Sequence, residues 1–189
     1  MEKLGAAQAS HNIYGNFQKV SYEKLILKGE QYTDEEFKPD ISSLTHPADF
    51  TGSQIASATK KMWRDKVSWK RISDLFPSAI VYKDNSKDYD MKEFSPDDVV
   101  SGVFSQSYLH TCMKKIATDA SMAIKKLFIT KDINSVGVYV LDIYVDGSPK
   151  TVTIDDYIPY FESSKQPAFI NTNTNCIWAL LLEKAWAKV

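Results

Sequence analysis

The sequence predicts an α+β fold, and three patterns carry this prediction. Apolar residues recur at steps of three and four from position 107 to 127, which is the spacing of one helix face. Apolar and polar residues then alternate from 136 to 154 around Asp146-Gly147, a pair typical of a two-residue β-hairpin turn. A second helical stripe begins at Trp178 and continues to the end of the sequence. Helices and a hairpin are therefore expected to share one core.

Composition bounds the class of protein. The 189 residues, 43% of them hydrophobic, can bury one substantial core. The 23 Lys and Arg nearly balance the 24 Asp and Glu and are scattered, so we expect no nucleic-acid partner. No stretch approaches the roughly 18 apolar residues of a membrane span, and two cysteines are too few for a disulfide framework. We therefore expect a cytoplasmic protein with no membrane partner.

Residues 1–30 hold few clustered apolar residues, which predicts an extended N-terminal arm. We expect Tyr14, Phe17 and Tyr22 to anchor this arm on a partner protein, because large rigid aromatic side chains dominate interface energetics. The alternative is that the arm folds back onto its own chain. The folded domain is predicted to span residues 31–189.

The expected elements follow in order along the domain. Apolar spacing between 51 and 75 predicts a short helix and then an irregular segment, and the charged stretch 83–93 predicts a surface loop. The stripe from 107 to 127 predicts one continuous core helix, with Cys112 packed on its apolar face as a small hydrophobic residue. The hairpin at 136–154 comes next, and the helix from Trp178 is the last element.

From 32 to 189 the order of these elements and four short motifs resemble the calpain family of papain-like cysteine proteases. Residues 181–188 read LLEKAWAK, which is similar to the family's LLEKAYAK, and residues 153–159 read TIDDYIP, which is similar to V-x-V-D-D-x-L-P. More loosely, Trp69-Lys70-Arg71 resembles W-x-R and Phe37-x-Pro39 resembles F-P. The resemblance implies a papain-like half-core, the first catalytic subdomain, with the helix that begins at Ser107 at its centre and the second subdomain absent.

The family's active segment reads roughly D-I-x-Q-G-x-L-G-D-C-W-F-L and resembles residues 98–110. The resemblance puts Ser107 at the position of the nucleophilic cysteine and Ser101 at that of the oxyanion-stabilising glutamine. A serine needs a general base within hydrogen-bond reach, and His110, on the same helix face as Ser107, does not by itself supply one. We therefore expect both positions to be degenerate, Ser107 to cap its helix, and the chain not to be an enzyme.

Calcium is the metal that the resemblance implies. In the family the aspartate that opens the active segment and the glutamate of N-E-F-W are among the ligands; here Asp98 matches the first, and Cys176 stands at the second. Calcium prefers six to eight hard oxygen ligands, so a thiol removes both charge and coordination. We expect no cofactor, and Asp98 is the single candidate metal ligand.

The function implied by the resemblance is a non-catalytic calpain-like module that binds other proteins of a larger assembly, as inactive calpain-like proteins of the cytoskeleton and the cilium do. Two alternatives stay open. One is a regulatory partner of an active calpain-type protease, and the other is a calcium-dependent cysteine-type endopeptidase with residual activity. Native co-purification with a partner, or turnover by a clean monomer, would discriminate between these functions.

Overall fold

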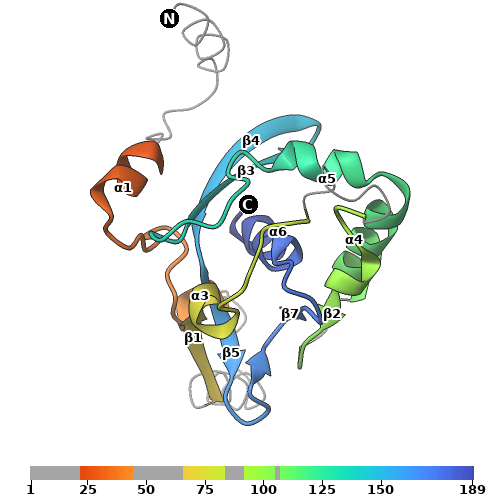
Figure 1. Ribbon diagram of the computed structural model, residues 1–189. Coiled ribbons are helices and arrows are strands. Elements are labelled where there is room, and N and C mark those ends of the chain that lie inside the picture. Colours follow the sequence, from red (N-terminus) through yellow and green to blue (C-terminus); the bar gives the residue numbers. More distant parts are fainter. Residues whose placement is uncertain (1–21, 45–65, 84–91, 105–106) are drawn as a thin grey trace, which may run out of the picture.

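The computed structural model describes residues 22–44, 66–83, 92–104 and 107–189, and these residues confirm the α+β fold. Figure 1 shows helix α6 in the middle, with α4 and α5 on one side and the curved hairpin of β3 and β4 on the other. The helices are α1 (Tyr22–Lys28), η1 (Ile41–Ser43), α3 (Ile72–Leu75), η3 (Pro96–Asp98), α4 (Ser107–Asp119), α5 (Ser121–Leu127) and α6 (Trp178–Lys188). The strands are β1 (Val67–Arg71), β2 (Val100–Ser101), β3 (Val138–Val145), β4 (Ser148–Asp155), β5 (Tyr157–Phe161), β6 (Gln166–Pro167) and β7 (Ile170–Asn171).

The predicted hairpin is confirmed. Strands β3 and β4 are antiparallel and pair from Val138 opposite Asp155 to Val145 opposite Ser148. The two residues between them, Asp146 and Gly147, have φ values of 50° and 76°. An Asp-Gly pair adopts this left-handed conformation readily, and its twist matches that of the flanking strands. The hairpin is therefore specified by local sequence.

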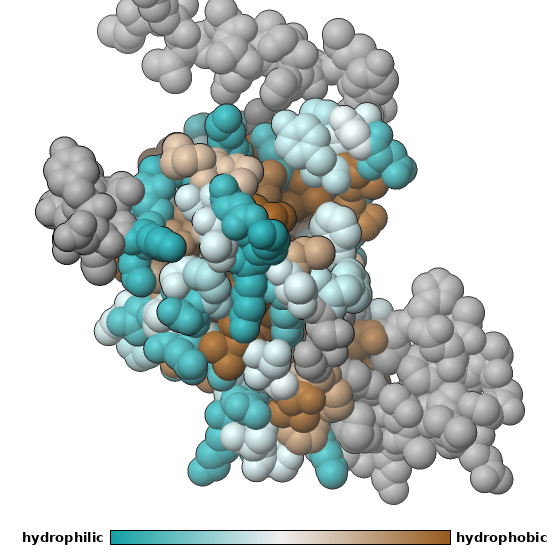
Figure 2. Space-filling model, turned by 90° about the vertical axis from the view of Figure 1, so that its right-hand side faces the viewer, coloured by the Kyte–Doolittle hydropathy of each residue, from teal (hydrophilic) through white to brown (hydrophobic). Residues whose placement is uncertain are grey.

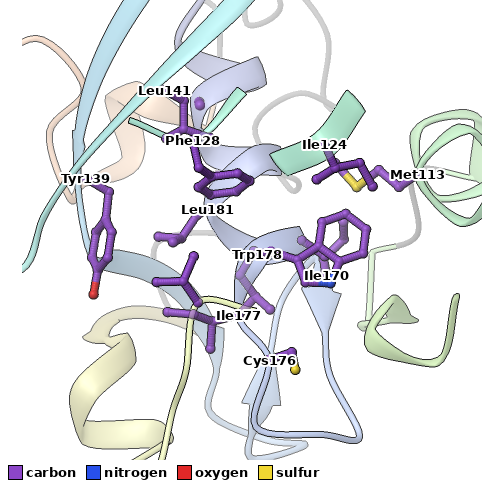
Figure 3. Packing of buried hydrophobic residues seen from close by; sticks show 14 of the residues in the cluster. Met113, Ile124, Phe128, Tyr139, Leu141, Ile170, Cys176, Ile177, Trp178 and Leu181 are labelled. Carbon is purple, nitrogen blue, oxygen red and sulfur yellow. The ribbon is translucent and has the colours of Figure 1, made fainter. Parts of the chain in front are cut away.

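The predicted helix from 107 to 127 is interrupted. Ala120 has φ −146° and ψ 45°, which ends α4 before α5 starts. The buried face of α4 includes Met113 and Ala117, whereas Cys112 is exposed, so the prediction that Cys112 packs in the core is wrong. The break turns α5 back toward the body of the molecule, and Ile124 of α5 lies next to Met113 in the core (Figure 3).

Helix α6 occupies the centre of the core, a place that the resemblance assigned to the helix beginning at Ser107. It lies beside β3, β4 and β7. Trp178, its first residue, is fully buried and meets the ring of Phe94 edge-on at 5.5 Å between centroids. The exposed face of α4 carries Lys114, Lys115 and Asp119, whereas α6 opens with five consecutive apolar residues and can be surrounded. Neither α6 nor any other helix in the described residues has the length and apolarity to span a bilayer.

Two small sheets complete the fold, and the sequence did not predict them. In one, β1 pairs with β5, and β5 pairs with β6; in the other, β2 pairs with β7. Strand β1 lies where an irregular segment was expected, and residues 51–65, of the helix expected before it, lie outside the described part. Strands of two to five residues are too short to produce a readable alternation. The pairing of β2 with β7 sets Ser101 opposite Ile170.

The N-terminal segment differs in part from the extended arm that was predicted. Residues 22–28 form α1, which lies beside β3 and has no buried residue. Tyr22 is half-buried at its start. Tyr14 and Phe17 lie outside the described residues, so their role as anchors on a partner stays a prediction. The chain joins the body at Tyr32, whose backbone N–H donates to the carbonyl of Val136 over 2.8 Å.

Candidate functional site

The candidate site begins at the end of β2, where Ser101 is exposed and Gly102 follows it. A Cβ atom on Gly102 would lie less than 3.0 Å from backbone atoms of Pro167, Ala168 and Phe169. The Gly102 N–H donates to the Phe169 carbonyl, and the Phe104 N–H donates to the Ala168 carbonyl over 2.7 Å. A glycine is therefore required for this close approach. The backbone that carries Ser101 is held firmly against the segment 167–169.

Ser101, His110 and Glu183, from three separate elements, lie one after another in the site. His110, in α4, is buried with 4% of its surface exposed, and its Nδ1 lies 3.1 Å from the hydroxyl oxygen of Ser101. Its other ring nitrogen, Nε2, lies 3.6 Å from Oε1 of Glu183 in α6. The second oxygen of Glu183 accepts a hydrogen bond of 2.9 Å from the backbone N–H of Ile170. Folding thus lines up a hydroxyl, an imidazole and a carboxylate.

This arrangement favours one direction for the hydrogen bond between Ser101 and His110. A carboxylate that faces Nε2 favours the tautomer with its proton on that nitrogen, so Nδ1 accepts and the Ser101 hydroxyl donates to it. A hydroxyl that donates to an imidazole backed by a carboxylate has the order of groups found in hydrolytic triads. The sequence did not predict it. The available signal was a histidine on the buried face of α4 and a glutamate within the LLEKAWAK motif.

Ser107 is the first residue of α4, and its side chain lies outside the described set. Its predicted role as a helix cap therefore stays a prediction. Tyr108, directly after it, is exposed, as is Val103 after β2. The sequence argued against a catalytic pair of His110 with Ser107, and in the structure His110 Nδ1 lies within hydrogen-bond distance of Ser101.

Asp98, the candidate calcium ligand, is fully buried at the end of η3. Its Oδ1 accepts from the Thr174 hydroxyl over 2.8 Å, and its Oδ2 accepts from Trp178 Nε1 over 2.8 Å and from the Ser95 N–H over 2.9 Å. Burial, and then the Asp98 charge, raise the pKa of the Cys176 thiol. As they stand, these residues do not fit a calcium ion, because the ion would have to displace these hydrogen bonds. Within the described residues no three His, Cys, Asp or Glu are grouped to hold a metal.

Two adjacent carboxylates at the end of β4 pair with different cations. Asp155 pairs with Lys184 of α6, and Asp156 pairs with Arg71 of β1. All four side chains are buried. Burial lowers the pKa of Lys184 and the Asp155 carboxylate opposes that shift, whereas burial raises the pKa of Asp156 and Arg71 opposes it. The two aspartates therefore join elements of the core and do not form an acid–base couple.

Comparisons with known proteins agree on one family. A family model described as calpain family cysteine protease matches residues 32–189. The chain is 31% identical over 169 residues to the calpain-type cysteine protease DEK1 of Arabidopsis thaliana, covering 88% of the chain and 7% of that protein. It is 33% identical over 170 residues to the calpain-type cysteine protease ADL1 of Oryza sativa subsp. japonica, covering 88% and 7%. It is 24% identical over 181 residues to the calpain-like protease palB/RIM13 of Debaryomyces hansenii, covering 93% and 22%.

The chain thus spans less than a quarter of the length of these relatives. The family and the relatives are named as cysteine proteases, which are enzymes. The prediction that the chain is not an enzyme is contradicted by these matches. That prediction rested on the residue types at Ser107 and Ser101 and on the absence of the second subdomain, and residue types at two positions of one resembling segment do not determine the activity of a whole protein.

Proposed function

Since this chain belongs to the calpain family of cysteine proteases, we propose that residues 31–189 act as one catalytic subdomain of a peptide-cleaving enzyme and supply one wall of its substrate cleft. The observation that carries this proposal is the surface where β2 ends and α4 begins. There the exposed residue Ser101 lies in the same short segment as the exposed apolar side chains of Val103 and Tyr108. A polypeptide substrate needs apolar contacts for affinity and polar groups for orientation.

The same surface suits the chemistry of peptide cleavage. Helix α4 has 13 residues and begins within this segment, so the dipole at its N-terminal end favours negative charge that develops on a nearby carbonyl oxygen. The close packing of Gly102 on the backbone of 167–169 holds the segment in place. A rigid support matters because misplaced reacting groups lose much of the rate that proximity supplies.

The test is cleavage of a fluorogenic casein-derived peptide by the natural polypeptide that contains this chain, with calcium and reductant. Tyr108→Ser removes an apolar contact worth about 1 kcal/mol and should raise KM roughly fivefold. Tyr144→Ser is the matched control, because Tyr144 lies in the hairpin and is exposed to nearly the same degree, 61% against 64% for Tyr108. Absence of cleavage, or equal effects of the two variants, would refute the proposal.

A second candidate function, binding other proteins in a larger assembly, is supported by exposed large apolar side chains that include Met122 and Trp186. On the face that carries α4 and α5, hydrophobic patches interrupt the hydrophilic surface (Figure 2). Gel filtration of a cell extract tests this function. Elution at a mass above the monomer, reduced by Trp186→Ser, supports it, and monomeric elution contradicts it. A cytoplasmic, cytoskeletal or ciliary location belongs to this proposal.

A further inference from the structure

We propose that Ser101, His110 and Glu183 form a serine-type acyl-transfer site that takes carboxylic acyl groups, as esters or peptides, from its substrate. All three residues belong to this chain, so this activity needs no second subdomain and stands apart from the peptidase function proposed above. The nucleophile is the Ser101 hydroxyl, His110 is the general base, and Glu183 orients the imidazole and stabilises its charged form.

The exposure of the three groups follows the order that the chemistry requires. Ser101 is exposed and can meet a substrate. The side chain of His110 is 5% exposed, which holds the imidazole in one orientation, and that of Glu183 is 13% exposed behind it. A nucleophile within hydrogen-bond reach of a base, and a base backed by an orienting group, are the two geometric criteria for an activated serine. The first is met at 3.1 Å between Ser101 Oγ and His110 Nδ1.

The site is also built from connected parts. Ile170 of β7 is the pairing partner of Ser101 in β2, and its backbone N–H donates to Glu183 over 2.9 Å. The strand that positions the nucleophile therefore also positions the carboxylate. Gly102, the residue after Ser101, donates its backbone N–H to the carbonyl of Phe169 and so holds the end of β2 in place. Such support from surrounding backbone keeps reacting groups near their productive geometry.

The proposal also gives a reason for two buried polar atoms of the described residues that lack a hydrogen-bond partner. Among the described residues, His110 Nε2 and Glu183 Oε1 have no hydrogen-bond partner although both are buried. They face each other at 3.6 Å, which is longer than a hydrogen bond. A buried polar atom without a partner is unfavourable, and a small approach would give a strong charge-assisted bond once the imidazole holds a second proton. Glu183 is thus placed to orient the imidazole of His110.

The reaction balances with water as the single co-reactant. Ser101 Oγ bonds to the carbonyl carbon while its proton passes to His110 Nδ1. The bond from that carbon to the leaving oxygen or nitrogen breaks, and the leaving group takes the proton from Nδ1, so an acyl ester remains on Ser101. Water then attacks this ester and gives a proton to Nδ1. The acid departs, and the proton returns to Ser101 Oγ, while Glu183 stays ionised throughout.

The experiment uses the whole 189-residue chain. A fluorophosphonate probe should add once, on Ser101 by peptide mapping, and p-nitrophenyl acetate should be hydrolysed. Ser101→Ala should remove the adduct and lower the ester rate about 100-fold or more. Ser148→Ala is the control, because Ser148 is exposed at the hairpin turn, and it should change neither readout.

Glu183→Gln separates a positioning role from a structural one. Glutamine keeps an oxygen that accepts from Ile170, so the melting temperature should change little, while the rate of adduct formation should fall about tenfold or more because the imidazolium loses its countercharge. Hydrolysis of a peptide p-nitroanilide then shows whether the site accepts peptides as well as esters. Turnover of the ester or of the peptide supports the site. An adduct on another serine, no adduct at all, or an unchanged ester rate in Ser101→Ala would overturn the proposal.

Discussion

Lys184→Met is the substitution whose effect on stability is best defined by the structure. The ammonium of Lys184 pairs with Asp155 and donates to the carbonyl of Tyr157 over 2.6 Å. Asp155 is fully buried. Methionine has a similar length and fills the same space, so the main loss is the cation and not the packing. A buried carboxylate without its counterion is expensive because it has lost its hydration as well.

The magnitude follows from what Asp155 retains. Removing one partner of a buried ion pair costs about 3–5 kcal/mol. Asp155 still accepts from the N–H groups of Asp34, over 2.7 Å, and Tyr157, over 2.8 Å, so we expect the lower end of that range. For a chain of this length, about 3 kcal/mol lowers the melting temperature by roughly 6–12 °C.

The assay is urea unfolding followed by circular dichroism, with Lys115→Met as the control. Lys115 also pairs with an aspartate, Asp119, but its side chain is 74% exposed, so its loss should cost less than about 0.5 kcal/mol. A double-mutant cycle with Asp155→Asn isolates the pair, since neutralising both partners should recover part of the loss. If Lys184→Met lies within about 1 kcal/mol of the parent chain, or matches the control, the reasoning is refuted.

Three further predictions concern the active segment, the cysteines and calcium. Gly102→Ala should destabilise the chain by about 3 kcal/mol, because the new methyl group meets backbone atoms that cannot rotate away. Gly29→Ala is the control: Gly29 has φ +70° and open space around it, so this substitution should cost about 1 kcal/mol. Equal melting temperatures of the two variants would contradict the prediction. Iodoacetamide at neutral pH should label Cys112 and spare Cys176, whose pKa burial raises; mass spectrometry that finds both labelled in the folded protein would disagree. Melting curves in millimolar calcium and in chelator should superimpose within about 1 °C, since Asp98 is already satisfied; a larger rise that Asp98→Asn abolishes would show a calcium site.

The sequence by itself determined the features that depend on neighbours a few residues away. Asp146-Gly147 specifies the hairpin turn because both residues accept a left-handed backbone. The apolar run that opens α6 specifies a buried helix. The LLEKAWAK motif pointed to the family, and the structure gives a reason for its lysines. Lys184 pairs with Asp155, and Lys188 pairs with Asp34 at the start of the matched region.

Tertiary structure decided which of these local elements meet. Periodicity assigns a face to a helix but does not say what covers it, so α4 was expected at the centre, where α6 lies, and Cys112 was expected to be buried. The contact of His110 with Ser101 and its approach to Glu183 depend on β2 pairing with β7 and on α6 packing against β7. The approach of His110 to Glu183 joins residues far apart in the chain, and the contact of His110 with Ser101, although the two are only nine residues apart, needs the backbone of β2 to be held by β7. Both contacts are fixed when the whole core assembles, so local spacing in the sequence carries no record of them.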